Sequence, residues 1–326
     1  MNDRAAETSH APTLHEIDAA ATRIRPYVHH TPILHSRSID QDLGAHLSFK
    51  CENLQRGGAF KFRGACNAVL SLDETAIAGG VATHSSGNHA AALCLAAGLR
   101  GARAVVVMPR GSSAVKAAAV RRYGGEIVPC DPTQEAREGT LAEVVAKRGC
   151  HPVPPYDDYR VIAGQGTAAR ELLAAEPEID LLVTPLGGGG LLSGSAIVAR
   201  ALLPKLRVIG VEPAGADDAR RSLAAGRIVT DVVPRTVADG LRARIGQLTF
   251  PIIQCCVDAV VAVSEESIIG AMRLLWERMK LVVEPSSAVA LAALLAGAID
   301  GAGQRIAIIL SGGNVDLDAL PWVAGR

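Results

Sequence analysis

The feature that most constrains the fold is an alternation of short apolar segments with longer segments of helical pattern, which runs from Gly80 almost to the end of the chain. Parallel strands joined by helices form sheets with helices on both faces. The sequence therefore predicts an α/β fold with parallel sheets. We expect strands at 47–51, 81–83, 104–108, 126–129, 181–186, 207–211 and 306–310, and helices at 14–24, 88–97, 113–123, 135–148, 162–174, 191–202, 265–279 and 287–296.

Local signals mark several of these boundaries. Thr13 and Glu16 have the spacing of a capping box at the start of the first helix. Gly98 is expected to end the helix at 88–97. A proline-rich link at 151–155 separates two runs of the alternation, which indicates a crossing between domains.

Composition argues against several classes of function. The chain has 326 residues, of which 49% are apolar, so it can bury a sizeable core. Its 33 basic and 33 acidic residues cancel and only 3% are aromatic, which argues against nucleic-acid binding. The polar start does not resemble a secretory signal, and the longest apolar run, 288–299, is too short to span a bilayer. We predict a soluble, cytoplasmic protein that binds neither nucleic acid nor membrane.

The seven cysteines form no Cys-x-x-Cys pair. This odd number and spacing favour reduced, mostly buried thiols over disulfides or a zinc site. The adjacent Cys255 and Cys256 could be redox-active, but we interpret them as half-buried strand residues.

One lysine has surroundings that suit chemistry. Lys61 lies between Phe60 and Phe62, with glycines on both sides. Burial among apolar groups lowers the pKa of a lysine, and a neutral amine can attack a carbonyl. The segment 65–72 favours a helix, so Lys61 should lie near a helix N-terminus, where the helix dipole lowers its pKa further. The alternative is a lysine whose charged end reaches solvent while the two phenylalanines enter the core.

A second motif joins a buried strand to a helix through Gly187, Gly188, Gly189 and Gly190. Consecutive glycines let backbone N–H groups converge on an anion at a helix N-terminus. The motif fits neither the dinucleotide-binding fingerprint nor the P-loop. A tight strand-to-helix turn is the alternative, but it needs fewer glycines, so we favour a phosphate site.

Two further motifs follow predicted strands. The segment 83–89, with the sequence THSSGNH, should lie at the carboxyl edge of a sheet, where ligands bind in open α/β folds. Ser85 or Ser86 could instead only cap the helix, and the histidines could be core residues. Ser311 ends the last strand before Gly312-Gly313-Asn314, and the alternative there is a simple turn.

A reactive lysine, a phosphate cradle without a nucleotide motif and a hydroxyl at a strand end together fit pyridoxal phosphate. From about Thr13 to Leu320 the sequence resembles fold type II pyridoxal-phosphate enzymes, the serine racemase and threonine/serine dehydratase family. The segments that carry the resemblance are 58–64, 85–89, 161–167, 187–190, 238–240, 276–280 and 311–314.

The resemblance implies how the cofactor is held. Lys61 matches the lysine that forms the Schiff base and serves as the base on one face of the cofactor. Phe60 matches the residue that packs on the pyridine ring, and Asn88 the partner of the phenolic oxygen. The glycines at 187–190 match the phosphate loop, and Ser311 matches the partner of the pyridine nitrogen.

The resemblance also places residues around the substrate. Ser86 matches the acid/base of racemases on the face opposite the lysine. Arg137 matches an arginine that reaches the distal end of the substrate, where it could bind a β-carboxylate as in 3-hydroxyaspartate. Tyr156 and the pair Ala243-Arg244 depart from the racemase pattern. The gain of Tyr156 and the loss of a hydroxyl at Ala243 could instead admit a larger substituent, as in phenylserine. The residues expected around the substrate carboxylate are Ser85, Ser86, Asn88 and His89.

A divalent-cation site is implied by the same resemblance. Glu212, the carbonyl of Ala216 and Asp218 resemble the cation ligands of the family, and hard oxygen ligands suit Mg²⁺ or Ca²⁺. Without the resemblance this stretch reads as an acidic surface loop.

The predicted reaction follows from the hydroxyl expected at the pyridine nitrogen. A serine does not keep the ring protonated as a carboxylate would, so a long-lived carbanion is disfavoured and loss of a β-leaving group is favoured. We predict a dehydratase (ammonia-lyase) that converts a β-hydroxy-α-amino acid, such as threonine, serine, 3-hydroxyaspartate or phenylserine, to a 2-oxo acid and ammonia. The alternative enzyme is a serine or aspartate racemase with side dehydratase activity. A binding protein that has lost catalysis is disfavoured because Lys61, Asn88 and Ser311 are all present.

The family resemblance implies a two-domain, open parallel-sheet architecture similar to the tryptophan synthase β subunit. We predict a large cofactor-binding domain at 1–78 and 158–326 and a small domain at 79–157, with the active site between them. A homodimer is the family expectation. Because the chain ends soon after Asn314, we expect no C-terminal regulatory domain.

Overall fold

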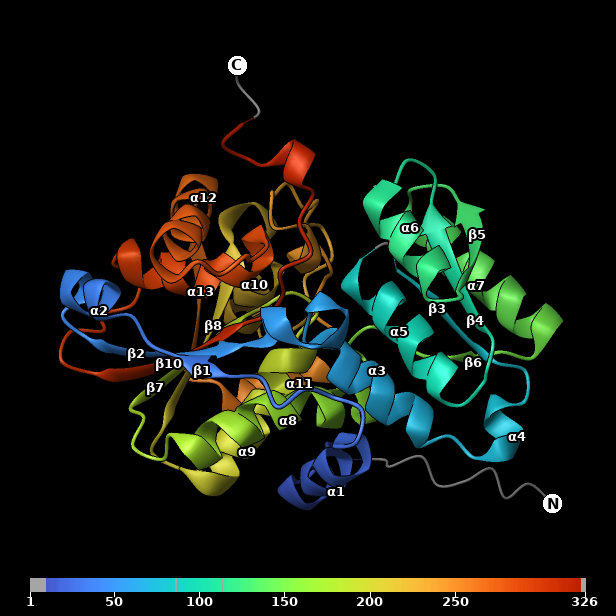
Figure 1. The fold of residues 1–326 in the computed structure, drawn as a ribbon, viewed down its shortest axis with the longest axis horizontal. Coiled ribbons are helices and arrows are strands. Elements are labelled where there is room, and N and C mark those ends of the chain that lie inside the picture. The colour runs from blue at the N-terminus through green and yellow to red at the C-terminus, as the bar shows by residue number, and fades with distance from the viewer. Residues whose placement is uncertain (1–9, 86, 113, 324–326) are drawn as a thin grey trace.

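The computed structural model describes residues 10–85, 87–112 and 114–323 (Figure 1). Two parallel sheets stand side by side, and the helix α3 (Lys61–Leu70) lies between them. This helix packs against α8 (Tyr159–Ala175) of one lobe and α5 (Asn88–Leu99) of the other. The predicted α/β class with parallel sheets is confirmed.

The larger sheet has the strand order β1-β2-β10-β7-β8-β9. β1 pairs antiparallel with β2, and all other pairs in this sheet are parallel. Strands covered on both faces read as continuous apolar runs, which is the composition of β7 and β10. The strands are β1 (Ile33–Leu34), β2 (His46–Cys51), β7 (Leu181–Pro185), β8 (Arg207–Pro213), β9 (Ala259–Val263) and β10 (Arg305–Leu310).

The smaller sheet has the order β5-β4-β3-β6 and is parallel throughout. Its strands are β3 (Val81–His84), β4 (Ala104–Pro109), β5 (Glu126–Cys130) and β6 (His151–Pro152). All four lie inside the range predicted for the small domain. The exact domain boundaries stay a prediction.

Helices cover both faces of the larger sheet. α12 (Glu265–Leu274) and α13 (Pro285–Leu295) lie on one face, and α8 and α9 (Gly190–Leu202) lie on the other (Figure 1). Thr13 caps the first helix through the predicted capping box with Glu16. The remaining helices are α1 (Leu14–Ile24), α2 (Arg37–Leu43), α4 (Glu74–Ile77), α6 (Ala114–Arg122), α7 (Gln134–Arg148), α10 (Asp218–Ala225) and α11 (Thr249–Cys256).

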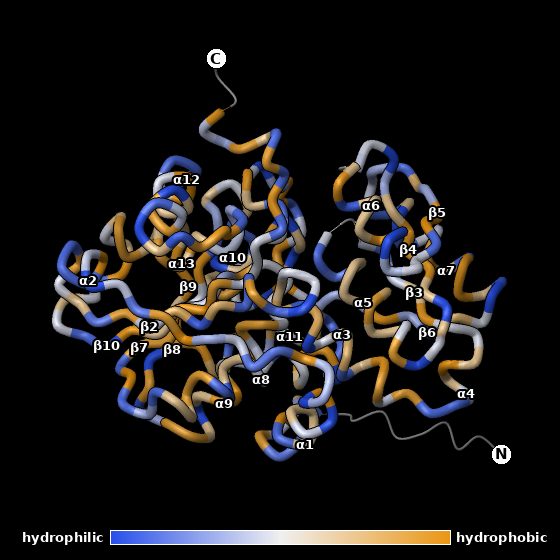
Figure 2. The backbone as a smooth tube through the Cα atoms, viewed as in Figure 1, coloured by the Kyte–Doolittle hydropathy of each residue, from blue (hydrophilic) through white to orange (hydrophobic). Residues whose placement is uncertain are grey.

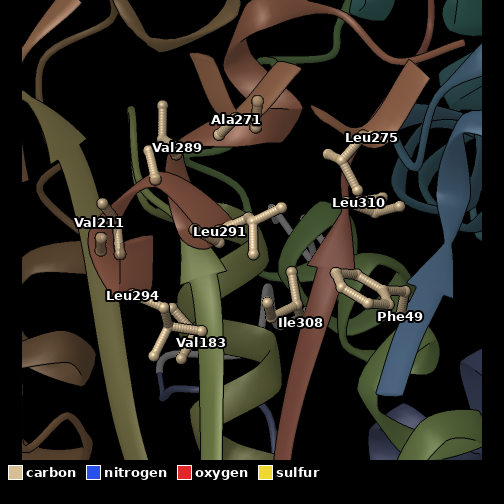
Figure 3. Packing of buried hydrophobic residues seen from close by; sticks show 14 of the residues in the cluster. Phe49, Val183, Val211, Ala271, Leu275, Val289, Leu291, Leu294, Ile308 and Leu310 are labelled. Atoms are coloured by element: carbon tan, nitrogen blue, oxygen red, sulfur yellow. The ribbon is translucent and has the colours of Figure 1, made fainter. Parts of the chain in front are cut away.

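The two faces of β10 contribute side chains to two different hydrophobic cores. Ile308 and Leu310 pack with Leu291 beneath α12 and α13 (Figure 3), whereas Ala307 and Ile309 face α8 and α9. This is the period-two alternation of strand side chains. Apolar residues follow the strands of both lobes (Figure 2). Each fully buried Leu or Ile side chain contributes roughly 1.5–3 kcal/mol to the free energy of folding. These cores fix the strand ends where the functional loops begin.

Two local predictions were wrong, and one predicted helix changes its hydrogen-bond pattern within the predicted range. Gly98 does not end its helix, because α5 continues to Leu99 and the left-handed turn falls at Gly101, with φ 61°. The predicted helix at 265–279 ends as α12 at Leu274 and continues as a π-helical turn to Met279.

Cys255 and Cys256 also differ from expectation, since they end helix α11 and do not lie in a strand. A short apolar run does not distinguish helix from strand by its pattern. Both are free thiols, and the other five cysteines are buried, as predicted. Across the described residues, no helix combines the length and apolar character needed to cross a membrane.

Candidate active site

Lys61 is the first residue of α3, the helix between the two sheets. Its Nζ donates a hydrogen bond to the Pro155 carbonyl at 2.7 Å. The same nitrogen lies 4.9 Å from the ring centroid of Phe60 and 6.0 Å from that of Tyr156. Burial lowers the pKa of Lys61 to about 7, although nearby Glu284 opposes this shift. The amine is therefore substantially neutral near physiological pH.

The segment before Lys61 is joined to the end of β10. The Phe60 N–H donates to the Ser311 carbonyl at 3.0 Å, and the Gly313 N–H donates to the Gly58 carbonyl at 2.9 Å. Ser311 is 4% exposed, and in the described part of the chain its hydroxyl has no hydrogen-bond partner. The structure thus brings the predicted lysine and the predicted strand-end hydroxyl together from opposite ends of the chain.

The glycine loop connects β7 to α9 and faces Tyr156. Gly189 adopts a left-handed conformation with φ 94° as the N-cap of α9. A Cβ atom on Gly188 would lie 2.4 Å from the Tyr156 ring, so only glycine fits there. Within the described residues, the backbone N–H groups of 187–190 make no hydrogen bonds. Unpaired N–H groups at a helix N-terminus form a site for an anion.

The loop after β3 supplies the third side of the site. The Asn88 Nδ2 donates to Glu284 Oε1 at 2.8 Å, so the first residue of α5 contacts the larger lobe. His89 is buried with its Nε2 3.0 Å from the Val153 carbonyl, and burial lowers the pKa of this ring to about 3. The His89 ring is therefore neutral. Ser85 accepts a hydrogen bond from the Gly87 N–H, and Ser86 lies outside the described residues.

Two buried polar residues at this site were not predicted from the sequence. Glu284 is 3% exposed, and its carboxyl group accepts a hydrogen bond from Asn88. Gln165 donates from Nε2 to the Pro155 carbonyl that also accepts from Lys61. For Glu284, the only signal in the sequence was its place directly before the apolar segment that forms α13. A glutamate is seldom fully buried.

Residues 24–312 match the family described as "Pyridoxal-phosphate dependent enzyme". The chain belongs to this family. It is 49% identical over 311 residues to a beta-hydroxyaspartate dehydratase of Paracoccus denitrificans, covering 95% of this chain and 99% of that protein. It is 50% identical over 309 residues to a serine racemase of Arabidopsis thaliana, covering 93% of each. Among solved structures, maize serine racemase superposes with a TM-score of 0.93 at 45% identity over 97% of both chains.

The residues of this chain fit the cofactor of the pyridoxal-phosphate-dependent family. The glycine loop offers unpaired N–H groups for a phosphate, and added side chains would block it. The orphaned Ser311 hydroxyl suits a ring nitrogen, and the neutral amine of Lys61 suits an aldehyde. The predicted family and its fold type are confirmed.

The predicted substrate side chains lie on three different segments. Arg137 belongs to α7, and its Nε is buried without a hydrogen-bond partner among the described residues. Tyr156 lies in the link after β6, where burial raises the pKa of its phenol to about 12. Arg244 lies in the loop before α11, and its positive charge acts to lower the pKa values of Tyr156 and Asp218 against the effect of burial. Their roles in substrate binding stay predictions.

The predicted cation ligands lie where β8 meets α10. The Glu212 carboxylate accepts from the backbone N–H groups of Ala219 and Arg220, at 3.0 and 2.8 Å. Asp218 Oδ2 accepts from the Ile245 N–H at 2.8 Å. Burial raises the pKa of Glu212 to about 8 and raises that of Asp218 as well. Two buried carboxyl groups with raised pKa values would both be stabilised in their ionised form by a bound cation.

Proposed function

We propose that this protein is a pyridoxal-phosphate-dependent dehydratase that eliminates water from a β-hydroxy-α-amino acid, after which hydrolysis of the resulting enamine gives a 2-oxo acid and ammonia. The observation that supports this most is the neutral amine of Lys61, which lies beside a glycine loop with free N–H groups and an unpaired serine hydroxyl. The similarity to a beta-hydroxyaspartate dehydratase agrees with this reaction class.

Five parts of the chain would hold the cofactor. Lys61 would bind its aldehyde, and the N–H groups of 187–190 its phosphate. Ser311 would donate to the ring nitrogen, Asn88 to the phenolic oxygen, and Phe60 would pack against the ring. When bound, pyridoxal phosphate withdraws electrons from the substrate's α-carbon and so acidifies its proton.

Lys61 would act as the general base. Freed by the substrate amine, Lys61 would take the α-proton, because a pKa of about 7 keeps a large share of its amine unprotonated near neutral pH. A serine at the ring nitrogen would make the ring a weak electron sink, so loss of the α-proton would be accompanied by loss of the β-hydroxyl group, and the proton and the hydroxyl group together would leave as water. The enamine would then hydrolyse to the 2-oxo acid and ammonia.

The substrate class we favour is 3-hydroxyaspartate. The guanidinium of Arg137 carries a buried Nε without a partner, which a second carboxylate would satisfy. A relative that covers nearly the whole chain is named for β-hydroxyaspartate. Ser85 and His89, with Tyr156 and Arg244 at the far side, would surround the substrate in this proposal.

A second candidate activity is amino-acid racemisation, of serine or aspartate. The serine racemase of Arabidopsis thaliana is 50% identical over 309 residues, and the chain has the serine expected of the opposite-face acid, Ser86. Racemisation would return a proton to the α-carbon from that face, whereas dehydration would not need it.

We further propose a Mg²⁺ or Ca²⁺ ion held by Glu212, Asp218 and the Ala216 carbonyl. A homodimer in the cytoplasm also stays part of the proposal. A cation at this site would fix the Asp218 carboxylate, which accepts from the Ile245 N–H next to Arg244. Its removal should then lower turnover without removing the cofactor.

The first experiment measures 2-oxo acid release from L-serine, L-threonine, threo-3-hydroxyaspartate and β-phenylserine, each with Mg²⁺ and with a chelator. We expect 3-hydroxyaspartate to give the highest kcat/KM, Mg²⁺ to raise it, and Glu212→Gln to remove the Mg²⁺ response. Lys61→Ala should abolish turnover, whereas Lys205→Ala, at an exposed lysine, should not change it. Oxo acid from none of the four substrates, with cofactor bound, would contradict the proposal. Chiral analysis of the recovered amino acids would then test racemisation.

A further inference from the structure

Glu284 is a buried acid without an evident structural use. It is 3% exposed and precedes α13 as its N-cap, yet its side chain makes no capping hydrogen bond. In the described part of the chain it forms no ion pair. Burying a carboxyl group in this way is costly. Among the described residues, the one hydrogen bond of its side chain is the 2.8 Å contact in which Asn88 Nδ2 donates to Oε1.

Burial favours the neutral form of Glu284. Burial raises the pKa of Glu284 to about 8, and Asp239 acts in the same direction. Lys116 on α6, Asn88 on α5 and Lys61 on α3 act in the opposite direction but do not outweigh burial. Below this pKa the group accepts the Asn88 hydrogen bond as an uncharged acid.

The amide of Asn88 is held from both sides. Its Nδ2 donates to Glu284, and its Oδ1 accepts from Asn314 Nδ2 at 3.0 Å. Asn314 is itself held, because the same Nδ2 donates to the Gly57 carbonyl at 2.8 Å. Rotating the Asn88 amide by half a turn would lose the hydrogen bond that Glu284 Oε1 accepts and would place donor against donor at Asn314. The two partners therefore select one orientation.

Among the residues that the structure describes, this orientation leaves one donor of Asn88 unused. A side-chain amide has two N–H donors, and Glu284 takes only one. Gly312 lies beside the pair, and a Cβ atom there would be 2.7 Å from Glu284 Oε1 and 3.2 Å from Asn88 Nδ2. A glycine at 312 thus keeps the amide edge open on the side of Ser311.

We propose that Glu284 is a positioning residue that fixes the Asn88 amide with its second N–H toward the phenolic oxygen of bound pyridoxal phosphate. The inference rests on the proposed contact between Asn88 and the cofactor. A donor at that oxygen stabilises its ionised form, which absorbs visible light. Without the donor, the neutral form that absorbs in the near ultraviolet gains population.

The test compares absorbance spectra and cofactor affinity of the holoenzyme variants. Glu284→Ala should shift absorbance from the visible to the near-ultraviolet band and weaken cofactor binding about twofold to tenfold, as expected for one lost hydrogen bond. Glu284→Gln keeps an uncharged carbonyl acceptor of the same length, so it should retain the wild-type spectrum. Glu265→Ala and Glu265→Gln are the matched controls. Glu265 is the first residue of α12, and its carboxyl group accepts a hydrogen bond from the Val237 N–H and not from Asn88.

Two results would overturn the inference: a wild-type spectrum and affinity in Glu284→Ala, or an equal defect in Glu284→Gln and Glu284→Ala. If Glu284→Ala fails to fold, Asn314→Ala removes the other partner of the amide and should shift the spectrum in the same direction. An unchanged spectrum there would also overturn it. Asn88→Ala distinguishes a missing contact between Asn88 and the cofactor from a missing role of Glu284. No shift in that variant refutes the cofactor contact itself, whereas a shift there but not in Glu284→Ala refutes only the role of Glu284.

Discussion

At the scale of single residues, the site depends on side chains whose ordinary charge is suppressed. Lys61 has a pKa near 7, His89 one near 3 and Glu284 one near 8, and burial is the largest cause in each case. Each group is therefore uncharged over part of the physiological range. An amine without a proton, a neutral imidazole and an uncharged acid together suit a site that moves protons and excludes water.

The lowered pKa of Lys61 predicts how the cofactor-free protein captures pyridoxal phosphate. Only the unprotonated amine attacks an aldehyde. Because the folded-state pKa is about 7, the uptake rate should rise about tenfold per pH unit below this value and level off above it. Rapid-mixing absorbance between roughly pH 5.5 and 9 measures this profile. A rate that still rises steeply at the top of the range would show a solvated lysine with an ordinary pKa.

At the scale of elements, α3 is anchored by a buried ionic network two residues beyond the reactive lysine. Arg63, fully buried, donates to Glu52 at 2.8 Å and to Glu171 at 2.7 Å. Lys50, also fully buried, donates to Glu171 at 2.6 Å. The network ties β2 and α3 to α8. A buried charge is tolerated only when it is paired in this way.

Breaking this network should destabilise the fold. Arg63→Ala leaves the Glu52 carboxylate buried without its partner, and we expect a loss of about 3–5 kcal/mol in the free energy of unfolding. Urea denaturation followed by far-ultraviolet circular dichroism measures this loss. Arg305→Ala removes an exposed pair with Glu178 and should shift the midpoint little. Equal effects of the two variants would contradict the anchoring role.

At the scale of the whole molecule, few polar contacts join the two lobes across the site. Asn88 reaches Glu284 and Asn314, and Lys61 reaches the Pro155 carbonyl. A further contact is an ion pair between Lys116 on α6 and Asp239 in the 3-10 turn at 239–241. Because this pair is partly exposed, it stabilises the contact between the lobes only weakly.

The cross-lobe pair can be tested separately from global stability. Asp239→Asn removes one charge, so α6 should lose protection in hydrogen exchange while the unfolding free energy changes by less than about 1 kcal/mol. Lys147→Ala is the control, because Lys147 pairs with Glu143 within α7 and joins no lobes. Unchanged exchange at α6 in Asp239→Asn would show that the pair does not hold the lobes together.

The sequence by itself determined the alternation of strands and helices and the three motifs around Lys61, Gly187–Gly190 and Ser311, because these signals are local. Only the tertiary structure decided which side chains from distant segments contact each other. It placed Glu284 against Asn88, 196 residues away, and turned the run ending at Cys256 into a helix. Such pairings depend on packing between distant segments, and a short apolar run satisfies either secondary structure until its neighbours bury one of them.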